Sequence, residues 1–260
     1  MKFFILIVSL FAAVSAFPNR EERIVGGSVA KPNSHPFVVL LVVNLPNHND
    51  AMCGGSIISK TVILTAAHCL QGSISTEVAA GVHDITHEEP TQQHMTVMPP
   101  QYRVHSQFNP KNFNNDVATL ILPHQLTLNK YVATITLAKA NIGLLEGVNA
   151  MSLGWGDTVN GGPHSNVLKE VTNKIIKNSE CVPHYTGGIV NAAAMCVAST
   201  NRNGICDGDS GGPLVIAQGS NLIQVGIASF IPTRPNTCGV VPAGYARVSS
   251  FIAWIESHMK

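Results

Sequence analysis

The chain has 260 residues, of which 45% are hydrophobic and 12% are charged, and its formal net charge at pH 7 is +1. This length is enough to bury a large core, and the absence of any run of like charges gives no sign of a nucleic acid or a membrane surface as partner. Val, Ile, Thr, Gly, Pro and Asn are frequent and helix formers are not abundant, which favours short strands joined by turns over a helical bundle.

The N-terminus has the order of a secretory signal peptide. Lys2 provides a positive charge, residues 3–14 form an apolar run too short to span a bilayer, and Val14-Ser15-Ala16 offers small residues for cleavage. A buried N-terminal strand is the competing interpretation, but it does not account for this order. We therefore expect residues 1–16 to be removed and the protein to be secreted and extracellular, because no second apolar stretch is long enough to anchor it.

Residues 17–23 are charged and poorly suited to a core, and Ile24-Val25-Gly26-Gly27 follows them abruptly. An Arg beside this small apolar motif offers a site for proteolytic processing. Cleavage after Arg23 would create an α-ammonium group on Ile24, which could enter the protein only if an acid met it, since an unpaired buried charge is costly. These features predict an activation propeptide over 17–23 and a mature domain over 24–260.

Short apolar runs with turn residues between them fill the rest of the chain, and their spacing predicts an all-β sandwich or barrels. Residues 122–139 offer a link between two halves. Only the C-terminus is convincingly helical, because Ser249 or Ser250 can cap a helix and apolar residues at 251, 252, 255 and 259 fall roughly on one face. The predicted strands are 37–45, 54–59, 61–65, 81–82, 96–97, 117–122, 149–154, 169–176, 213–217, 222–230 and 244–248.

The cysteine count agrees with an oxidising compartment. An even number in a secreted chain predicts three disulfides and leaves their pairing open. The spacing lacks the paired CxxC pattern of a structural zinc site. The six residues are Cys53, Cys69, Cys181, Cys196, Cys206 and Cys238.

Residues 204–214 concentrate small and acidic residues around a single serine, in the order Gly-Ile-Cys-Asp-Gly-Asp-Ser-Gly-Gly-Pro-Leu. Small residues on both sides of Ser210 let the backbone turn tightly, and such a turn can point several N–H groups at one spot where an oxyanion could be held. Taken alone, the stretch is better explained as an Asp/Gly-rich surface loop.

Two other contexts give this serine candidate partners. His68 stands in the small-residue turn Thr65-Ala66-Ala67-His68-Cys69, and Asp116 stands just before an apolar strand. An arbitrary histidine or aspartate is a solvated or structural residue. Here three specific contexts occur together in the chain order His, Asp, Ser, which is one of the known orders of a catalytic triad.

With these residues the sequence resembles the chymotrypsin-like (trypsin-fold) family of serine endopeptidases over nearly all of 24–260. The resemblance implies an all-β fold of two six-stranded antiparallel β-barrels, with the active site in the cleft and a C-terminal helix. It also implies the disulfides Cys53–Cys69, Cys181–Cys196 and Cys206–Cys238. The motifs that carry it are Ile24-Val25-Gly26-Gly27, Thr65-Ala66-Ala67-His68-Cys69, Asn115-Asp116-Val117-Ala118, Gly154-Trp155-Gly156, Gly208-Asp209-Ser210-Gly211-Gly212-Pro213 and Gly244-Tyr245-Ala246-Arg247-Val248.

The resemblance assigns a role to each residue of the triad. Ser210 is implied as the nucleophile, and His68 as the base that takes its proton and later hands it to the leaving amine. Asp116 is implied to hold His68 in the required tautomer. The backbone N–H groups of Gly208 and Ser210 are implied to form the oxyanion hole.

Asp209 has a separate implied role. The family pairs the residue before the nucleophile with the new N-terminus, here Ile24, and this ion pair would order the loop 208–210 as a proteolytic switch. The alternative is that Asp209 only caps the turn.

The specificity pocket lacks an acid where trypsins carry one, because the resemblance places Gly204 at the pocket base. A long cationic side chain would be desolvated there without a partner. Asp207 is expected on the rim, where it either tunes neighbouring subsites or is simply solvated. We therefore expect an apolar pocket with a chymotrypsin-like or elastase-like preference, and activation by a separate trypsin-like protease. The residues expected to line the pocket are Gly204, Asp207, Ser229, Phe230, Ile231 and Ala243.

We expect no required metal or other cofactor. Some relatives bind calcium in a loop that corresponds to residues 81–92, but Val82 stands where those relatives carry a glutamate. The acids available in that loop are Asp84, Glu88 and Glu89, and its neighbouring histidines His83, His87 and His94 are scattered.

The sequence thus predicts a secreted serine endopeptidase made as a zymogen, with a digestive setting expected. Its expected partners are protein or peptide substrates, the activating protease and protein protease inhibitors, and it is expected to be a monomer. The rival interpretation is a non-enzymatic homologue on the same fold that acts as a binding or cascade adaptor protein. Such homologues usually lose one triad residue, and His68, Asp116 and Ser210 are all present.

Overall fold

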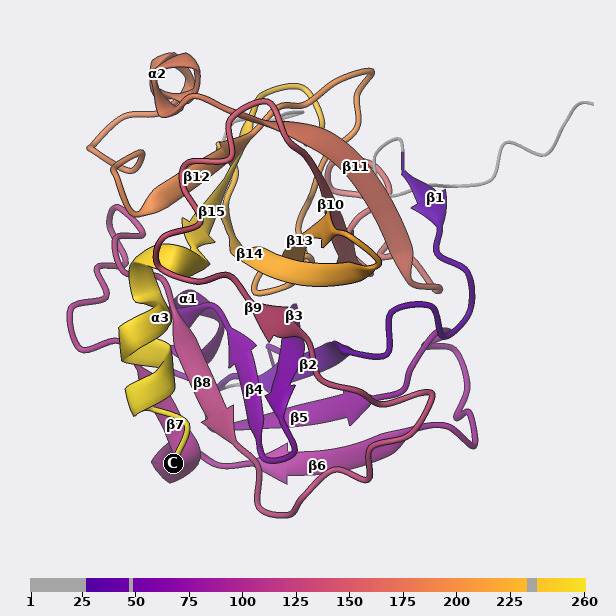
Figure 1. Ribbon diagram of the computed structural model, residues 1–260. Coiled ribbons are helices and arrows are strands. Elements are labelled where there is room, and N and C mark those ends of the chain that lie inside the picture. Colours follow the sequence, from indigo (N-terminus) through magenta and orange to yellow (C-terminus); the bar gives the residue numbers. More distant parts are fainter. Residues whose placement is uncertain (1–26, 47–48, 233–237) are drawn as a thin grey trace, which may run out of the picture.

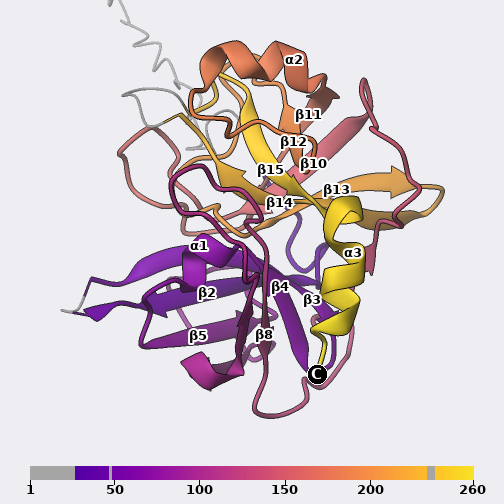
Figure 2. The ribbon, with the colours of Figure 1, turned by 90° about the vertical axis from the view of Figure 1, so that its left-hand side faces the viewer.

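The computed structural model describes residues 27–46, 49–232 and 238–260. Two β units are stacked, and Figures 1 and 2 show the N-terminal one below the C-terminal one. The N-terminal unit is a curled sheet in the order β6-β5-β2-β3-β4-β8-β7. Its strands are β2 (Val38–Asn44), β3 (Ala51–Ser59), β4 (Val62–Thr65), β5 (Ser75–Ala80), β6 (Gln93–Val97), β7 (Tyr102–Val104) and β8 (Ala118–Ile121).

The C-terminal unit is a closed barrel of six strands in the order β11-β10-β13-β14-β15-β12, because β11 also pairs with β12. Two short strands lie outside this ring: β1 pairs with β11, and β9 runs parallel to β14. Its strands are β1 (Ser28–Val29), β9 (Thr136–Leu137), β10 (Asn149–Gly154), β11 (Lys169–Ile176), β12 (Ala194–Val197), β13 (Pro213–Gln218), β14 (Asn221–Phe230) and β15 (Ala243–Arg247).

Strand β11 shows how an alternation of buried and exposed residues suits a barrel strand. Its side chains alternate along the strand, with Val171 and Ile175 buried and Thr172 and Lys174 exposed. This period of two places every second residue on the inner face of the barrel. The same interior is filled by Tyr245 of β15, whose hydroxyl is hydrogen-bonded to Ser152 of β10 at 2.7 Å.

The helices are few and mostly short: α1 (Ala67–Leu70), α2 (Asn178–Cys181) and the C-terminal α3 (Val248–Ser257). Helix α3 begins directly after β15, with Arg247 as its N-cap and without a side-chain cap, so the predicted caps at Ser249 and Ser250 are wrong. It runs along the N-terminal sheet (Figures 1 and 2), and Thr119 of β8 donates a hydrogen bond to the carbonyl of His258 at 2.9 Å. Its buried residues are Val248, Phe251 and Ile255.

The predicted all-β fold with a C-terminal helix is confirmed, and residues 122–139 join the two units as expected. The N-terminal unit differs in detail, since it has seven strands and no ladder joins β6 to β7 among the described residues. The two strands are separated by the short 3-10 helix Pro99–Gln101, and its two prolines have no N–H group to donate to a ladder. The predicted strand 81–82 is wrong, because β5 ends at Ala80 and Gly81 turns with a φ of 74°.

Candidate active site

His68 and Asp116 are in contact at the junction of the two units. His68 lies on α1, and its Nδ1 is 2.8 Å from Oδ2 of Asp116, which is fully buried. The backbone N–H of His68 donates to the other carboxylate oxygen at 2.9 Å, and Ser229 Oγ donates to Oδ2 at 2.5 Å. A carboxylate only accepts hydrogen bonds, so Nδ1 carries the proton and Nε2 of the neutral ring is left with a lone pair.

Ser210 lies in the loop that precedes β13, and this loop is wedged between the two units. The carbonyl of Ser210 accepts a hydrogen bond from the N–H of Gly54 on β3 at 2.7 Å, and the next N–H, of Gly211, donates to Ala228 on β14 at 2.8 Å. Gly211 has a φ of 77°, and a Cβ there would collide with Thr65 Oγ1. Because Thr65 ends β4 just before α1, these contacts bring the serine loop to the His68 turn.

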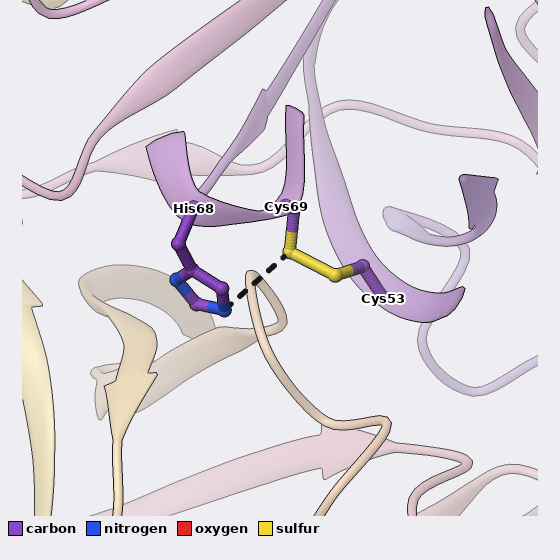
Figure 3. Close-up of side chains that lie close together, drawn as sticks. All are labelled: Cys53, His68 and Cys69. Atoms are coloured by element: carbon purple, nitrogen blue, oxygen red, sulfur yellow. Dashed lines mark hydrogen bonds between the residues drawn. A yellow bond between two sulfur atoms is a disulfide. The ribbon is translucent and has the colours of Figure 1, made fainter. Parts of the chain in front are cut away.

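Ser210 is partly exposed, and no hydrogen bond joins its hydroxyl to His68 among the described residues. Instead, Nε2 of His68 lies 3.8 Å from Sγ of Cys69 (Figure 3). Catalytic hydrogen bonds are often long or poorly aligned in proteins without substrate, so the missing bond does not exclude a catalytic pair of Ser210 and His68.

The described residues form three disulfides, and two of them hold segments that carry candidate residues. Cys53–Cys69 ties α1 to β3, and Figure 3 shows its sulfurs beside the His68 ring. Cys206–Cys238 ties the serine loop to the segment before β15, and Cys181–Cys196 ties α2 to β12. These are the pairs that the family resemblance implies.

Asp209 is a buried carboxylate without a cation beside it in the described part of the chain. Its Oδ1 accepts a hydrogen bond from Gly156 N–H at 2.8 Å and its Oδ2 accepts one from Cys206 N–H at 3.0 Å. Burial raises the pKa of Asp209 to about 6, with the two N–H donors opposing this effect. The predicted partner Ile24 and the predicted cleavage site at Arg23 lie outside the described residues.

Gly204 occupies a tight place in the predicted pocket. A Cβ there would lie 3.1 Å from the Cα of Gly239. Ala243 is also buried, while Ile231 is partly exposed and Asp207 is exposed. Residues 233–237, which follow Ile231 in the chain, lie outside the described residues.

Ser229 and Phe230 have contacts that the sequence did not indicate. Ser229 uses its hydroxyl to bind Asp116, so it supports the triad candidate and not only the pocket wall. The Phe230 ring lies over Gly244, and Tyr185 meets it edge-on with ring centroids 5.1 Å apart. Phe113 completes this aromatic group, since its ring also meets the His68 ring edge-on at 5.5 Å.

A second histidine–aspartate pair lies close to the serine loop and was also missed. Nδ1 of His164 is 2.8 Å from Oδ1 of Asp157, whose side chain is 6% exposed. Burial raises the pKa of Asp157 and His164 opposes this shift. No motif marks the pair in the sequence, because the two residues stand seven positions apart in an ordinary loop.

Two groups of side chains have the spacing of metal ligands among the described residues, and both depend on disulfide cysteines. They are Cys53-His68-Cys69 and Asp157-Cys206-Asp207. A cysteine in a disulfide offers no thiolate, so neither group is a metal site in the oxidised protein. In the loop 81–92, Glu89 instead accepts hydrogen bonds from the N–H groups of His83 and Asp84.

Among the described residues, no helix is long and apolar enough to cross a membrane.

Comparison with known proteins gives consistent matches over nearly the whole chain. The family model Trypsin matches residues 24–255. The chain is 37% identical to brachyurin of Leptuca pugilator, with 90% of this chain and 97% of the relative covered. It is 35% identical to granzyme B of Homo sapiens, with 97% and 98% covered. A solved structure of HL collagenase matches with a TM-score of 0.80 at 29% identity, with 90% of this chain and 97% of that chain covered.

Proposed function

The chain belongs to the trypsin family of chymotrypsin-like serine proteases, and on that premise we propose that it is a secreted endopeptidase, made as a zymogen, that cleaves after apolar residues. Family membership makes it a hydrolase that acts on protein substrates. The finer assignments rest on the geometry of the site. The observation that carries the proposed catalysis is the contact of the fully buried Asp116 with Nδ1 of His68, beside the Ser210 loop.

In the proposed reaction, Ser210 Oγ attacks the substrate carbonyl carbon while Nε2 of His68 takes the hydroxyl proton. Asp116 stabilises the imidazolium that forms, because its carboxylate already holds Nδ1–H. The C–N bond then breaks as His68 gives its proton to the leaving amine, which leaves an acyl-enzyme. A water molecule attacks the acyl group by the same route, with His68 taking its proton, and this releases the acid and restores Ser210.

The backbone N–H groups of Gly208 and Ser210 are proposed to hold the oxyanion. Neither N–H makes a hydrogen bond within the described residues, so both remain available to a substrate oxygen. Removing one such donor typically lowers kcat by about 10²–10³-fold.

Activation is proposed to depend on Asp209. Its carboxylate is buried between Gly154 and Gly156, whose lack of side chains makes room for it. A buried carboxylate with only N–H partners favours a cation that can reach it. Cleavage after Arg23 would supply the ammonium of Ile24, and the segment 1–23 would be lost as signal peptide and propeptide.

The preference for apolar residues is supported by what the described pocket residues lack. Gly204 and Ala243 offer no carboxylate to pair with a substrate Lys or Arg, and Asp207 is exposed. Such an enzyme would cut poorly after Arg23, so a separate trypsin-like protease is proposed as its activator. Protein protease inhibitors as partners, a monomeric state and a digestive setting complete the proposal.

The test uses the secreted proprotein, treated with a trace of trypsin and then with trypsin inhibitor. A peptide panel varies the residue before the cut between Phe, Tyr or Leu, Ala or Val, and Arg. Cleavage after the apolar residues, lost in Ser210→Ala, is expected. Preferred cleavage after Arg would refute the apolar preference, while a trypsin-treated protein that cleaves no peptide would favour the non-enzymatic adaptor.

A further inference from the structure

The peptide bond between Asp207 and Gly208 is held at its carbonyl end. The carbonyl of Asp207 accepts a hydrogen bond from the N–H of Asp157 at 2.7 Å. The C=O and N–H of a trans peptide point in opposite directions, so a fixed Asp207 carbonyl also fixes the direction of the Gly208 N–H. This is the N–H that is proposed to bind the oxyanion.

Gly208 does not fix this orientation by itself. Its φ is 93°, and a glycine adopts positive and negative φ with similar ease. A peptide next to such a residue can rotate unless neighbouring groups hold it. The orientation of the donor therefore depends on Asp157 and on whatever holds Asp157 in place.

Asp157 is held by His164. The two residues form a short antiparallel bridge, and their side chains are joined by the 2.8 Å contact of Nδ1 with Oδ1. The His164 ring also packs on the glycine, since a Cβ at Gly208 would lie 3.0 Å from Nδ1 and 3.1 Å from Cε1. His164 therefore restrains Asp157 through its side chain and Gly208 by direct contact.

The preceding residue connects this arrangement to the activation switch. The N–H of Gly156 donates to Oδ1 of Asp209, and the N–H of Asp157 donates to the carbonyl of Asp207. Two consecutive residues thus hold the loop on both sides of Gly208. The Asp157 carboxylate is nearly buried, so without His164 it would lose the ring N–H group that donates to it.

We propose that His164 and Asp157 are positioning residues, which hold the Asp207–Gly208 peptide so that the Gly208 N–H faces the substrate oxygen. Neither residue touches the reacting atoms, and the proposal rests on the proposed protease function. The pair should affect the transition state, in which the oxyanion is charged, much more than the bound substrate. Removing the pair is therefore expected to lower kcat and to leave KM nearly unchanged.

The experiment compares His164→Ala, His164→Gln and Asp157→Asn with the trypsin-activated wild-type enzyme. His94→Ala is the matched control, because His94 is an exposed histidine on β6 whose ring bonds, within the described part of the chain, only to Gln92. For each protein, kcat and KM are measured on a peptide anilide, and the inhibition constant is measured for a peptidyl trifluoromethyl ketone, which forms a charged hemiketal on the serine. Thermal unfolding identifies variants that do not fold.

We expect His164→Ala to lower kcat at least tenfold while KM changes less than twofold. The inhibition constant of the ketone should rise by a factor similar to the loss in kcat. His164→Gln, which keeps a donor for Asp157, should recover part of the loss, and His94→Ala should match the wild type. A folded His164→Ala with unchanged kcat, or with a raised KM alone, would overturn the proposal. If that variant does not fold, a wild-type kcat in both His164→Gln and Asp157→Asn overturns it. A wild-type enzyme without activity would instead refute the proposed function.

Discussion

Asp209 makes the free energy of unfolding of the uncleaved protein depend on pH, and the burial of this carboxylate sets the size of the effect. Its pKa is about 6 in the folded chain against an ordinary value of 3.8. Between these pH values the folded state keeps a proton that the unfolded chain has released, so the free energy of unfolding falls as the pH rises. At about 1.4 kcal/mol per pH unit the fall amounts to about 3 kcal/mol. The Asp209→Asn variant has no carboxyl group at this position to ionise, so its free energy of unfolding should not show this fall.

Urea unfolding of the uncleaved protein between pH 3.5 and 7.5 measures this difference, with Ser210→Ala in both proteins to prevent autolysis. Across this pH range, the free energy of unfolding of the protein that keeps Asp209 is expected to fall by about 3 kcal/mol relative to that of the Asp209→Asn variant. After cleavage at Arg23, the Ile24 ammonium should remove the loss, because an opposite charge favours the ionised carboxylate. If the difference in free energy of unfolding between the two uncleaved proteins does not change with pH, the burial argument is refuted. An identical pH dependence before and after cleavage would refute the ion pair.

Two further substitutions test the triad and the pocket. Ser229→Ala removes the hydroxyl that donates a hydrogen bond to Asp116. Because hydrogen bonds to charged groups contribute about 1.5–3 kcal/mol, kcat/KM on a peptide anilide should fall at least about tenfold. An unchanged kcat/KM would show that this contact is dispensable. Gly204→Asp places a carboxylate at the pocket base, so cleavage should move from apolar residues to Lys or Arg, and the proprotein should begin to activate itself after Arg23. Mass spectrometry of the incubated proprotein and the peptide panel measure both effects, and an unchanged apolar preference would place Gly204 outside the pocket.

Much of the fold and of the triad candidate could be predicted from the sequence, because local patterns and short motifs carry them. The strands with long apolar runs, such as β2 and β14, were predicted close to their observed ends. Shorter strands such as β7 were missed, since three residues show no period. The start of α3 was misplaced because β15 leads straight into it, and no capping side chain is needed where the chain is already held by the sheet.

The surroundings of the triad could not be predicted, because tertiary contacts create them. Phe113 stands among asparagines with no motif, yet its ring meets His68. Asp157 and His164 stand in an ordinary loop and gain their place only when the serine loop folds against them. Ser229 was expected in the pocket, and only the folded chain shows its bond to Asp116.

Covalent labelling of Ser210 tests the central claim most directly. The proprotein is incubated with a fluorophosphonate before and after a trace of trypsin, and both the adduct and the new N-terminus are identified by mass spectrometry. The account predicts an adduct on Ser210 only after an N-terminus appears at Ile24, and none in Arg23→Gln. Equal labelling before and after cleavage would contradict activation by the new N-terminus, and no labelling in the cleaved protein would contradict Ser210 as the nucleophile.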